Sequence, residues 1–387
     1  MTSSPFALLR ARIFDGSGFH DNAGLLVSDG RIAGIVPEAD IPTGYQPIPM
    51  EGGTLAPGLV DLQVNGGGGV MFNDAPSVEP LRIIAQAHLS LGTTSILPTL
   101  ITDTPEITRA AIDAVEAAIA QGVPGIVGLH LEGPHLSIAR KGAHDPALIR
   151  PMTEQDMALL TEAARRLPVL FVTVAPENVS MEQMRRLTDA GVILSLGHSD
   201  CDFATACAAA DHGAQCVTHL FNAMSQLGHR EPGMVGAALA RPELSFGLIA
   251  DFIHVHPEAI RVALAAKKGA ERVYLVSDAM APAGTDLEAF TLNGRTIQRQ
   301  GGRLTLADGT LAGADLDLPT AIRNVAGLGI SEAAALAMAS SVPARVIGLS
   351  ERIGSLRSGA PADLVLLDAA GRCARVWKQG EERVATA

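Results

Sequence analysis

Residues 169–199 read VLFVTVAPENVSMEQMRRLTDAGVILSLGHS, and this stretch decides the fold class. Two near-continuous apolar runs, at 169–177 and 192–199, flank a segment with the pattern of an amphipathic helix. Strands that are apolar on both faces and alternate with helices are typical of parallel sheets covered on both sides. The stretch therefore predicts one strand–helix–strand unit.

The same unit recurs from about residue 55 to residue 350. The other apolar runs are LVDLQV (59–64), TTSILPT (93–99), IVGLHLEG (126–133), QCVTHLF (215–221), SFGLIADFIHV (245–255) and VYLVSDA (273–279). Eight strand–helix units in about 300 residues favour a (β/α)8 barrel over an open doubly wound sheet. A Rossmann-like fold is the alternative, but GGGG at 66–69 lacks the GxGxxG spacing that a nucleotide-binding turn requires.

The two ends of the chain have a different pattern. Short alternating segments with Gly and Asp-Gly turns occur in the first 55 and the last 35 residues or so, which indicates strands without helices. We therefore predict a small β-sandwich domain formed by residues 1–56 and 352–387, and a barrel formed by residues 57–351. Within the barrel, residues 284–311 contain Asn-Gly and Asp-Gly turns and predict an inserted β-hairpin near the mouth.

Composition narrows the possible functions. Hydrophobic residues make up 47% of the 387 residues and charged residues 18%, which excludes a disordered chain. The net charge of −12 argues against nucleic acid or an anionic membrane as a partner. No apolar stretch reaches the roughly 18 residues of a membrane span, and no signal peptide is evident. The four cysteines form no CxxC pair, so we expect a cytoplasmic protein.

Polar side chains occur at the predicted carboxyl ends of five strands. They are Glu132, His198, His219, His254 and Asp278, on the third, fifth, sixth, seventh and eighth strands. In a barrel these ends converge on one mouth, where active sites lie. A single histidine at such a place is usually structural, and a single aspartate is often a helix cap. Five such residues at one rim predict a shared site.

The residue types indicate a metal centre. Two imidazoles and a carboxylate from separate strands suit a borderline divalent ion such as zinc, and leave a coordination position open for water. A bound ion lowers the pKa of that water to about 7. Asp278 could then accept the water's proton and later donate it to a leaving nitrogen. The pattern therefore predicts metal-assisted hydrolysis.

Several strings carry a family resemblance. They are APGLVDLQVNGGGG (56–69), GLHLEGPHL (128–136), KGAHDP (141–146), SLGHS (195–199), VTHLFNAM (217–224), REPG (230–233), IADFIHVHP (249–257), VSDAMAPAG (276–284) and GTLAG (309–313). In this order they resemble the N-acetylglucosamine-6-phosphate deacetylase family of the amidohydrolase superfamily, over nearly the whole chain. The resemblance implies that Glu132, His198 and His219 bind the metal and that Asp278 is the acid/base.

The resemblance also implies a substrate site. His144 would contact the acetyl carbonyl and stabilise the oxyanion. The sugar phosphate would be held by Asn222, Ala223, Arg230 and His254. Ala143 and the segment Leu311, Ala312 and Gly313 would line the sugar and acetyl pocket. In this family the arginine commonly reaches across a dimer interface, so a homodimer is expected, with Arg230 entering the neighbouring subunit's site.

Three departures from related patterns affect the prediction. Many amidohydrolases carry His-x-His after the first strand and bind two metals, whereas this chain has Gln63 and Asn65 there. Amides are poorer ligands for such ions. We therefore expect one divalent ion per chain, with zinc favoured over iron, manganese or cobalt, and with both amides near it. His135 is expected in the pocket wall rather than on the metal. Asp315 and Asp317 would add negative charge near the mouth.

The resulting hypothesis is hydrolysis of N-acetyl-D-glucosamine 6-phosphate to D-glucosamine 6-phosphate and acetate. One alternative is a related N-acetylhexosamine phosphate, such as the galactosamine epimer, or another amidohydrolase reaction. A second alternative is a sugar-phosphate-binding protein without catalysis, because a fold alone does not determine function. The presence of Glu132, His198, His219 and Asp278 together argues against the second alternative.

Overall fold

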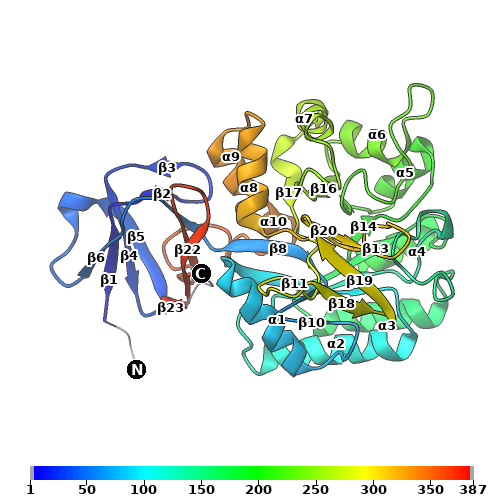
Figure 1. Cartoon of the computed structure of the whole chain (residues 1–387), viewed down its shortest axis with the longest axis horizontal. Coiled ribbons are helices and arrows are strands. Elements are labelled where there is room, and N and C mark those ends of the chain that lie inside the picture. Colours follow the sequence, from blue (N-terminus) through cyan, green and yellow to red (C-terminus); the bar gives the residue numbers. More distant parts are fainter. Residues whose placement is uncertain (1–3, 384–387) are drawn as a thin grey trace.

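A parallel eight-stranded barrel forms the centre of the molecule in this computed structural model, which describes residues 4–383 (Figure 1). Neighbouring strands in the sheet follow each other in sequence, and a bridge from Val64 to Ala279 brings the first strand against the segment after the last. This confirms the predicted barrel. Its strands are β8 (Leu59–Val64), β11 (Thr93–Ile101), β12 (Leu129–Glu132), β13 (Leu170–Val174), β14 (Ile193–Leu196), β15 (Cys216–Val217), β16 (Ser245–Leu248) and β17 (Val273–Leu275).

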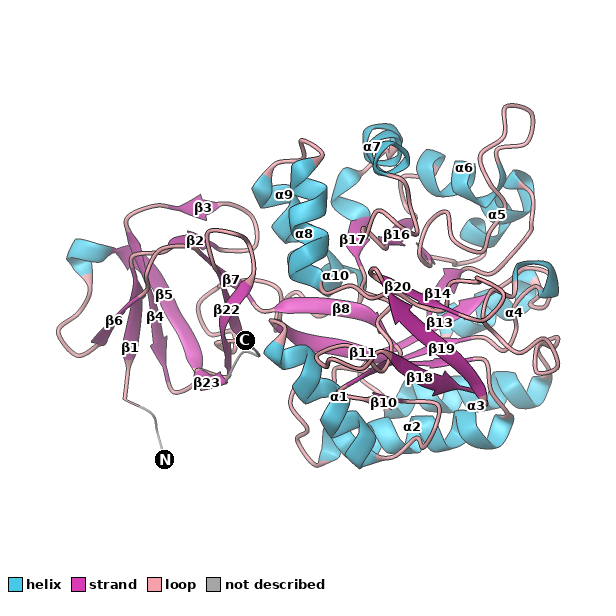
Figure 2. Ribbon diagram, in the orientation of Figure 1, coloured by secondary structure: helices cyan, strands magenta, loops and turns pink. Residues whose placement is uncertain are grey.

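Helices follow the strands and cover the outside of the barrel (Figure 2). Several begin at side-chain caps that the sequence encodes. The side chains of Thr153 and Ser180 each accept a hydrogen bond from the backbone N–H of the third helical residue, and their own backbone N–H groups donate to that residue's side chain, which satisfies donors that a helix start leaves free. The helices are α1 (Val78–Ser90), α2 (Pro105–Ala120), α3 (Glu154–Arg166), α4 (Met181–Asp189), α5 (Phe203–Asp211), α6 (Gly233–Ala240), α7 (Pro257–Ala266), α8 (Leu318–Gly327), α9 (Glu332–Met338) and α10 (Ser341–Val346).

One strand is shorter than its apolar run. β16 ends at Leu248, so the expectation that His254 ends the seventh strand is wrong. The backbone leaves the sheet because the Asp251 carboxylate accepts hydrogen bonds from the backbone N–H groups of Ile253 and His254, which form a turn. The apolar side chains that follow Leu248 belong to the loop, and periodicity alone does not separate them from a buried strand.

Strands from both ends of the chain form two sheets beside the barrel (Figure 1). Alternate residues of one strand face different cores: Leu364 and Leu366 pack with Phe6 and Trp377 between the two sheets, whereas Val365 packs on the barrel. The limits of the predicted domains stay predictions. One sheet contains β1 (Phe6–Leu9), β4 (Ala23–Ser28), β5 (Arg31–Pro37) and β6 (Gln46–Pro49); the other contains β2 (Arg12–Phe14), β3 (Phe19–His20), β7 (Thr54–Pro57), β21 (Leu364–Leu367), β22 (Cys373–Lys378) and β23 (Glu381–Arg383).

Two further small sheets lie at the mouth of the barrel. A short pair, β9 (Gly66–Gly67) and β10 (Val70–Met71), follows the first strand. The insertion is a three-stranded antiparallel sheet of β18 (Ala289–Leu292), β19 (Arg295–Gln300) and β20 (Arg303–Thr305), rather than the predicted two-stranded hairpin. A turn at Gly301–Gly302 lets the chain fold back, so that β20 pairs with β19 as the third strand. Within residues 4–383, the helices are all too short or too polar to span a membrane.

Candidate active site

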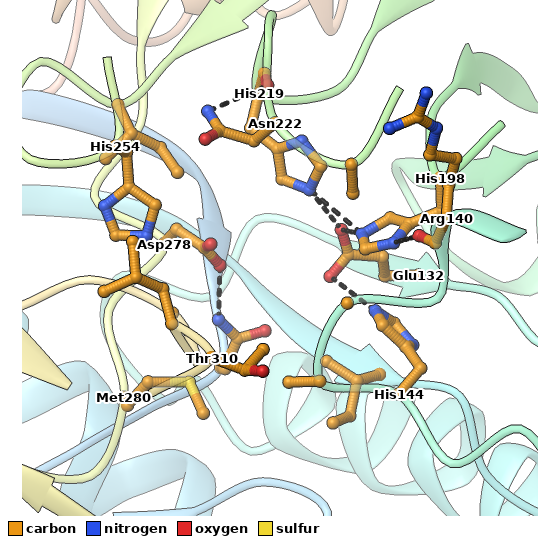
Figure 3. A pocket seen from close by; sticks show the side chains of 18 of the residues that line it. Glu132, Arg140, His144, His198, His219, Asn222, His254, Asp278, Met280 and Thr310 are labelled. Carbon is orange, nitrogen blue, oxygen red and sulfur yellow. Dashed lines mark hydrogen bonds and ion pairs between the residues drawn. The ribbon is translucent and has the colours of Figure 1, made fainter. Parts of the chain in front are cut away.

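A cavity of about 520 Å³ opens at the carboxyl ends of the barrel strands (Figure 3). Arg295 of the inserted sheet donates a hydrogen bond to the Ala143 carbonyl, which fixes the insertion against this mouth. The predicted site residues that line the cavity are Asn65, Glu132, Ala143, His144, His198, His219, Asn222, Ala223, His254, Asp278, Leu311 and Gly313. The structure therefore brings together residues that are up to about 250 positions apart in the chain.

Three of these side chains form a compact cluster. The Nε2 atoms of His198 and His219 lie 3.1 Å apart, and each is within 3.2 Å of the Glu132 Oε1 atom. All three side chains are buried, and among the described residues they are the group identified as able to hold a metal ion. The second nitrogen of His198, Nδ1, donates to the Arg140 carbonyl at 2.8 Å, which leaves the Nε2 lone pair free for a ligand. The donor set thus fits a zinc-like ion.

Electrostatics favour a charged Glu132. Burial alone would raise the pKa of this carboxyl, but hydrogen bonds from His198 and His219 hold the pKa well below its usual value. Burial acts to lower the pKa of His219, but the hydrogen bond to Glu132 together with the negative charges of Glu132 and Asp278 raises it overall. A carboxylate that lies against two imidazole nitrogens and stays ionised is well suited to bind a cation together with them.

His144 lies beside this cluster and remains neutral. Burial, followed by the charge of His198, lowers the pKa of its imidazole to about 3. The Thr102 backbone N–H donates to Nδ1, so the neutral ring carries its proton on Nε2. That Nε2 atom lies 3.9 Å from the Glu132 Oε2 atom. A neutral N–H group is therefore directed toward the Glu132 side of the cavity, where it could bond a carbonyl oxygen.

The Asp278 carboxylate faces the cluster across the cavity (Figure 3). Burial, with a smaller effect from the Glu132 charge, raises the pKa of Asp278 to about 6. The Asn65 amide donates to the Asp278 Oδ1 atom at 2.7 Å. The Gln63 amide donates instead to the Glu132 Oε1 atom at 3.1 Å, and Gln63 does not line the cavity. A carboxyl with a pKa near 6 can both accept and return a proton near neutral pH.

His254 and Asn222 lie on the side of the cavity away from His144 (Figure 3), and Ala223, next to Asn222 in the chain, also lines the cavity. His254 donates from Nδ1 to the Asp251 carboxylate at 2.6 Å, which leaves its Nε2 atom for a ligand. Two other predicted residues do not reach the cavity. Ala312 is fully buried in the core of the inserted sheet, and Arg230 lies exposed on the loop before α6.

The backbone at three site residues is strained. His198, His219 and Asp278 have φ angles of 48°, 33° and 51°, in the left-handed region that favours glycine. Each lies two or three residues beyond the end of its strand, where the chain turns sharply out of the barrel. Such conformations cost on the order of 1–3 kcal/mol each and cluster at functional sites.

Sequence reasoning did not identify some residues that shape the site. Arg140 lines the cavity, its carbonyl holds His198 and its guanidinium pairs with Asp200. Thr102 holds His144, and Thr310 and Met280 line the cavity wall. Arg140 directly precedes the KGAHDP string and could have been noticed as a cation beside the motif, whereas Thr102 follows a strand without any distinctive signal.

Three residues that depart from the family pattern lie outside the cavity. His135 is buried behind it, where its Nδ1 atom bonds the Arg150 carbonyl, so His135 is neither a ligand nor part of the pocket wall. Asp315 pairs with Arg299 at 2.8 Å, and Asp317 caps α8 by accepting from the Thr320 backbone N–H. Neither aspartate contributes to the lining of the active-site cavity.

A barrel with a buried Glu-His-His cluster and a carboxylate at its mouth defines a metal-dependent hydrolase site. Residues 54–383 match the amidohydrolase family. The chain belongs to this family and is an enzyme that hydrolyses an amide.

Similar proteins narrow the class further. The chain is 43% identical to N-acetylgalactosamine-6-phosphate deacetylase of Shewanella sp. (strain ANA-3), over 96% of this chain and 94% of the relative. It is 36% identical to N-acetylglucosamine-6-phosphate deacetylase of Haemophilus influenzae, over 93% and 94%. The crystal structure of N-acetylglucosamine-6-phosphate deacetylase from Pasteurella multocida superposes with a TM-score of 0.94, at 33% identity, over 98% of this chain and 99% of that one. These comparisons confirm the family resemblance.

Proposed function

We propose that the protein hydrolyses the acetamide of N-acetyl-D-glucosamine 6-phosphate, and releases acetate and D-glucosamine 6-phosphate. The observation that carries the proposal is that one cavity contains the Glu132 cluster and Asp278 together with the His254 end. Its volume of about 520 Å³ is within the range of small-molecule sites. The names of the relatives that cover nearly the whole chain support the same reaction.

The chemistry divides among five side chains and an ion. One divalent ion, for which zinc is our first choice, would be held by Glu132, His198 and His219, and would supply activated water and a polarised carbonyl. Asp278 accepts the proton that the water loses and returns it to the nitrogen when the C–N bond breaks. The His144 Nε2–H group donates to the acetyl oxygen as negative charge develops there.

The phosphate belongs at the end of the cavity formed by His254, Asn222 and Ala223. Asp251 accepts from His254 Nδ1 and so orients the ring, which leaves the Nε2 atom for a ligand. Arg230 is exposed and outside the cavity of its own chain. We propose that it completes the phosphate site of the second subunit in a homodimer, because its guanidinium matches phosphate oxygens.

We also propose that the protein is cytoplasmic and binds one divalent ion per chain. The four cysteines are unpaired, which suits the reducing cytoplasm. Gln63 and Asn65 occupy the place where many amidohydrolases have two histidine ligands, and both of their amide nitrogens are engaged with carboxylates. This supports one ion per chain rather than two.

The decisive experiment is acetate release from N-acetylglucosamine 6-phosphate by the purified protein, before and after chelation. We expect turnover that chelation abolishes and that a divalent ion restores. N-acetylglucosamine without phosphate is the control, and it should react at least about 100-fold more slowly because it lacks the phosphate contacts. No acetate release from any phosphorylated N-acetyl sugar would refute the proposal.

The galactosamine epimer is the second candidate substrate. The observation that favours it is the 43% identity to a relative named N-acetylgalactosamine-6-phosphate deacetylase. The two substrates differ only in the configuration of one ring hydroxyl, far from the acetamide. Measuring kcat/KM for both substrates in one assay discriminates the candidates, and a higher value for the galactosamine epimer would make it the principal substrate.

A further inference from the structure

We infer that the side-chain oxygen of Asn65 accepts a hydrogen bond from the amide N–H of the substrate, so that the site selects secondary amides. The inference rests on the proposed deacetylation and adds a specificity determinant to it. Asn65 is buried and lines the cavity, and its side-chain oxygen has no hydrogen-bond partner among residues 4–383.

Barrel closure fixes the position of Asn65. The Asn65 backbone N–H donates to the Ala279 carbonyl, and the Asp278 backbone N–H donates to the Gln63 carbonyl. These hydrogen bonds join the end of the first strand to the segment after the eighth. Asn65 and Asp278 therefore lie side by side as a consequence of topology, although 213 positions separate them in the chain.

The orientation of the Asn65 amide is determined by its neighbour. An ionised carboxylate accepts hydrogen bonds and cannot donate them, so the Asn65 nitrogen must be the atom that faces Asp278. The Asn65 oxygen is consequently the free atom. A buried acceptor without a partner is unfavourable, and a donor from the substrate would relieve that cost.

The geometry of a secondary amide directs its N–H group toward the side of the cavity formed by Asp278 and Asn65. In a planar trans amide the carbonyl oxygen and the N–H hydrogen point to opposite sides of the C–N bond. His144 and Glu132 lie on the side of the cavity that the carbonyl oxygen is proposed to face, and Asp278 lies on the other (Figure 3). The N–H hydrogen then points toward the Asp278 wall, where Asn65 Oδ1 is the unpartnered acceptor.

Asn65 and Asp278 thus act on different parts of the same nitrogen. Asp278 delivers a proton to the nitrogen lone pair, and Asn65 holds the hydrogen that the nitrogen already carries. A site that is built to bond a substrate N–H rejects analogues that lack it. The inference therefore concerns an amide with one N–H, and excludes an N-alkylated amide.

The test compares two substrates in three enzymes. The substrates are N-acetylglucosamine 6-phosphate and its N-methyl derivative, which keeps a nitrogen leaving group but replaces the hydrogen by a methyl group. The enzymes are the wild type, Asn65→Ala, and Gln63→Ala as the matched control, all loaded with the same divalent ion. The measured quantity is the ratio of kcat/KM for the two substrates.

We expect Asn65→Ala to reduce the preference for the N–H substrate by at least about 10-fold, because it removes the acceptor and creates space for a methyl group. Gln63→Ala should lower both values together, since Gln63 contacts Glu132 and does not line the cavity. Asn65→Ser provides the same comparison if the alanine variant does not fold.

An unchanged ratio in the Asn65 variants would overturn the inference, and would indicate that Asn65 acts only through Asp278 or water. If the wild type releases acetate from neither hexosamine epimer, the proposed function fails, and the inference fails with it. Wild-type turnover combined with an unchanged ratio refutes the inference alone.

Discussion

Two polar layers lie inside the same barrel, and they differ in how completely their hydrogen bonds are satisfied. The upper layer, at the mouth, consists of Asn65, Glu132, His198, His219 and Asp278. The lower layer, deeper in the barrel, consists of Asp61, His130, Thr173, Ser195 and Thr218. All ten side chains are buried.

Each side chain of the lower layer has a partner. His130 bonds the Leu62 carbonyl and the Thr173 hydroxyl, and Thr173 is linked through Thr218 to Ser195. Asp61 accepts from backbone N–H groups. In the upper layer, the Asn65 oxygen and the His219 Nδ1 atom have no partner. Burial and polarity are common to both layers, so among these ten side chains the unsatisfied atoms and the strained backbone distinguish the upper layer from the lower one.

The first prediction has the largest expected effect on turnover and concerns the upper layer as a whole. Removing the divalent ion with a chelator should abolish turnover, because the Glu-His-His cluster then holds no Lewis acid. Metal analysis by mass spectrometry, with activity measured on the same sample, checks this result. About one ion per chain is expected, and two tightly bound ions per chain would contradict the single-ion proposal.

The second prediction separates proton transfer from binding. Asp278→Asn should lower kcat by about 10³ to 10⁴, because the amide cannot accept the water's proton. Metal content and the affinity for glucosamine 6-phosphate should remain close to those of the wild type. Steady-state kinetics and calorimetric titration measure the two properties, and near-normal turnover would refute the acid/base role of Asp278.

The third prediction follows from the raised pKa of Asp278, about 6, which results first from burial. The base must be ionised, so kcat/KM should fall about tenfold per pH unit below the pKa. The positive charge of a bound ion favours the ionised carboxylate and moves this limb to lower pH. A pH–rate profile from pH 4 to 8 tests the direction, and an increase in rate on acidification would be inconsistent with a general base.

The fourth prediction has the smallest effect on activity and concerns the lower layer. Thr218→Val removes the hydroxyl that links Thr173 and Ser195. The free energy of unfolding should fall by about 1–3 kcal/mol, because buried hydroxyls lose a partner. The kcat of the folded enzyme should stay within about threefold of wild type. A loss of kcat well beyond threefold in the folded variant would mean that the two layers are coupled.

The sequence permitted accurate prediction wherever a repeating pattern acts locally. The segment 59–64 is a strand over the whole predicted range, and the amphipathic segment between the runs 169–177 and 192–199 contains a helix whose start is set by Ser180. The Glu132, His198 and His219 cluster was predictable because all parallel strands of a barrel end at the same mouth.

The remaining features depend on contacts between distant segments. The loop that carries His254 leaves the sheet because of a turn at Asp251, within an apolar run that resembles a strand. The contact between Thr102 and His144 links two loops that are 42 positions apart. His130 and Glu132 are equivalent as polar residues in one strand, and only their partners reveal that one is structural.

The terminal sheet has a consequence for the order of synthesis. β7 pairs with β21, so Leu55 meets Leu366 only after the entire barrel has left the ribosome. Until then Leu8, Leu25 and Leu55 lack the apolar surface of Leu364 and Trp377 that covers them in the finished protein. Val365 and Leu367 from the same late strand also complete the packing around the barrel. A ribosome that stops a few dozen codons early would therefore release a chain with two unfinished cores, which cellular quality control can recognise by its exposed apolar surface.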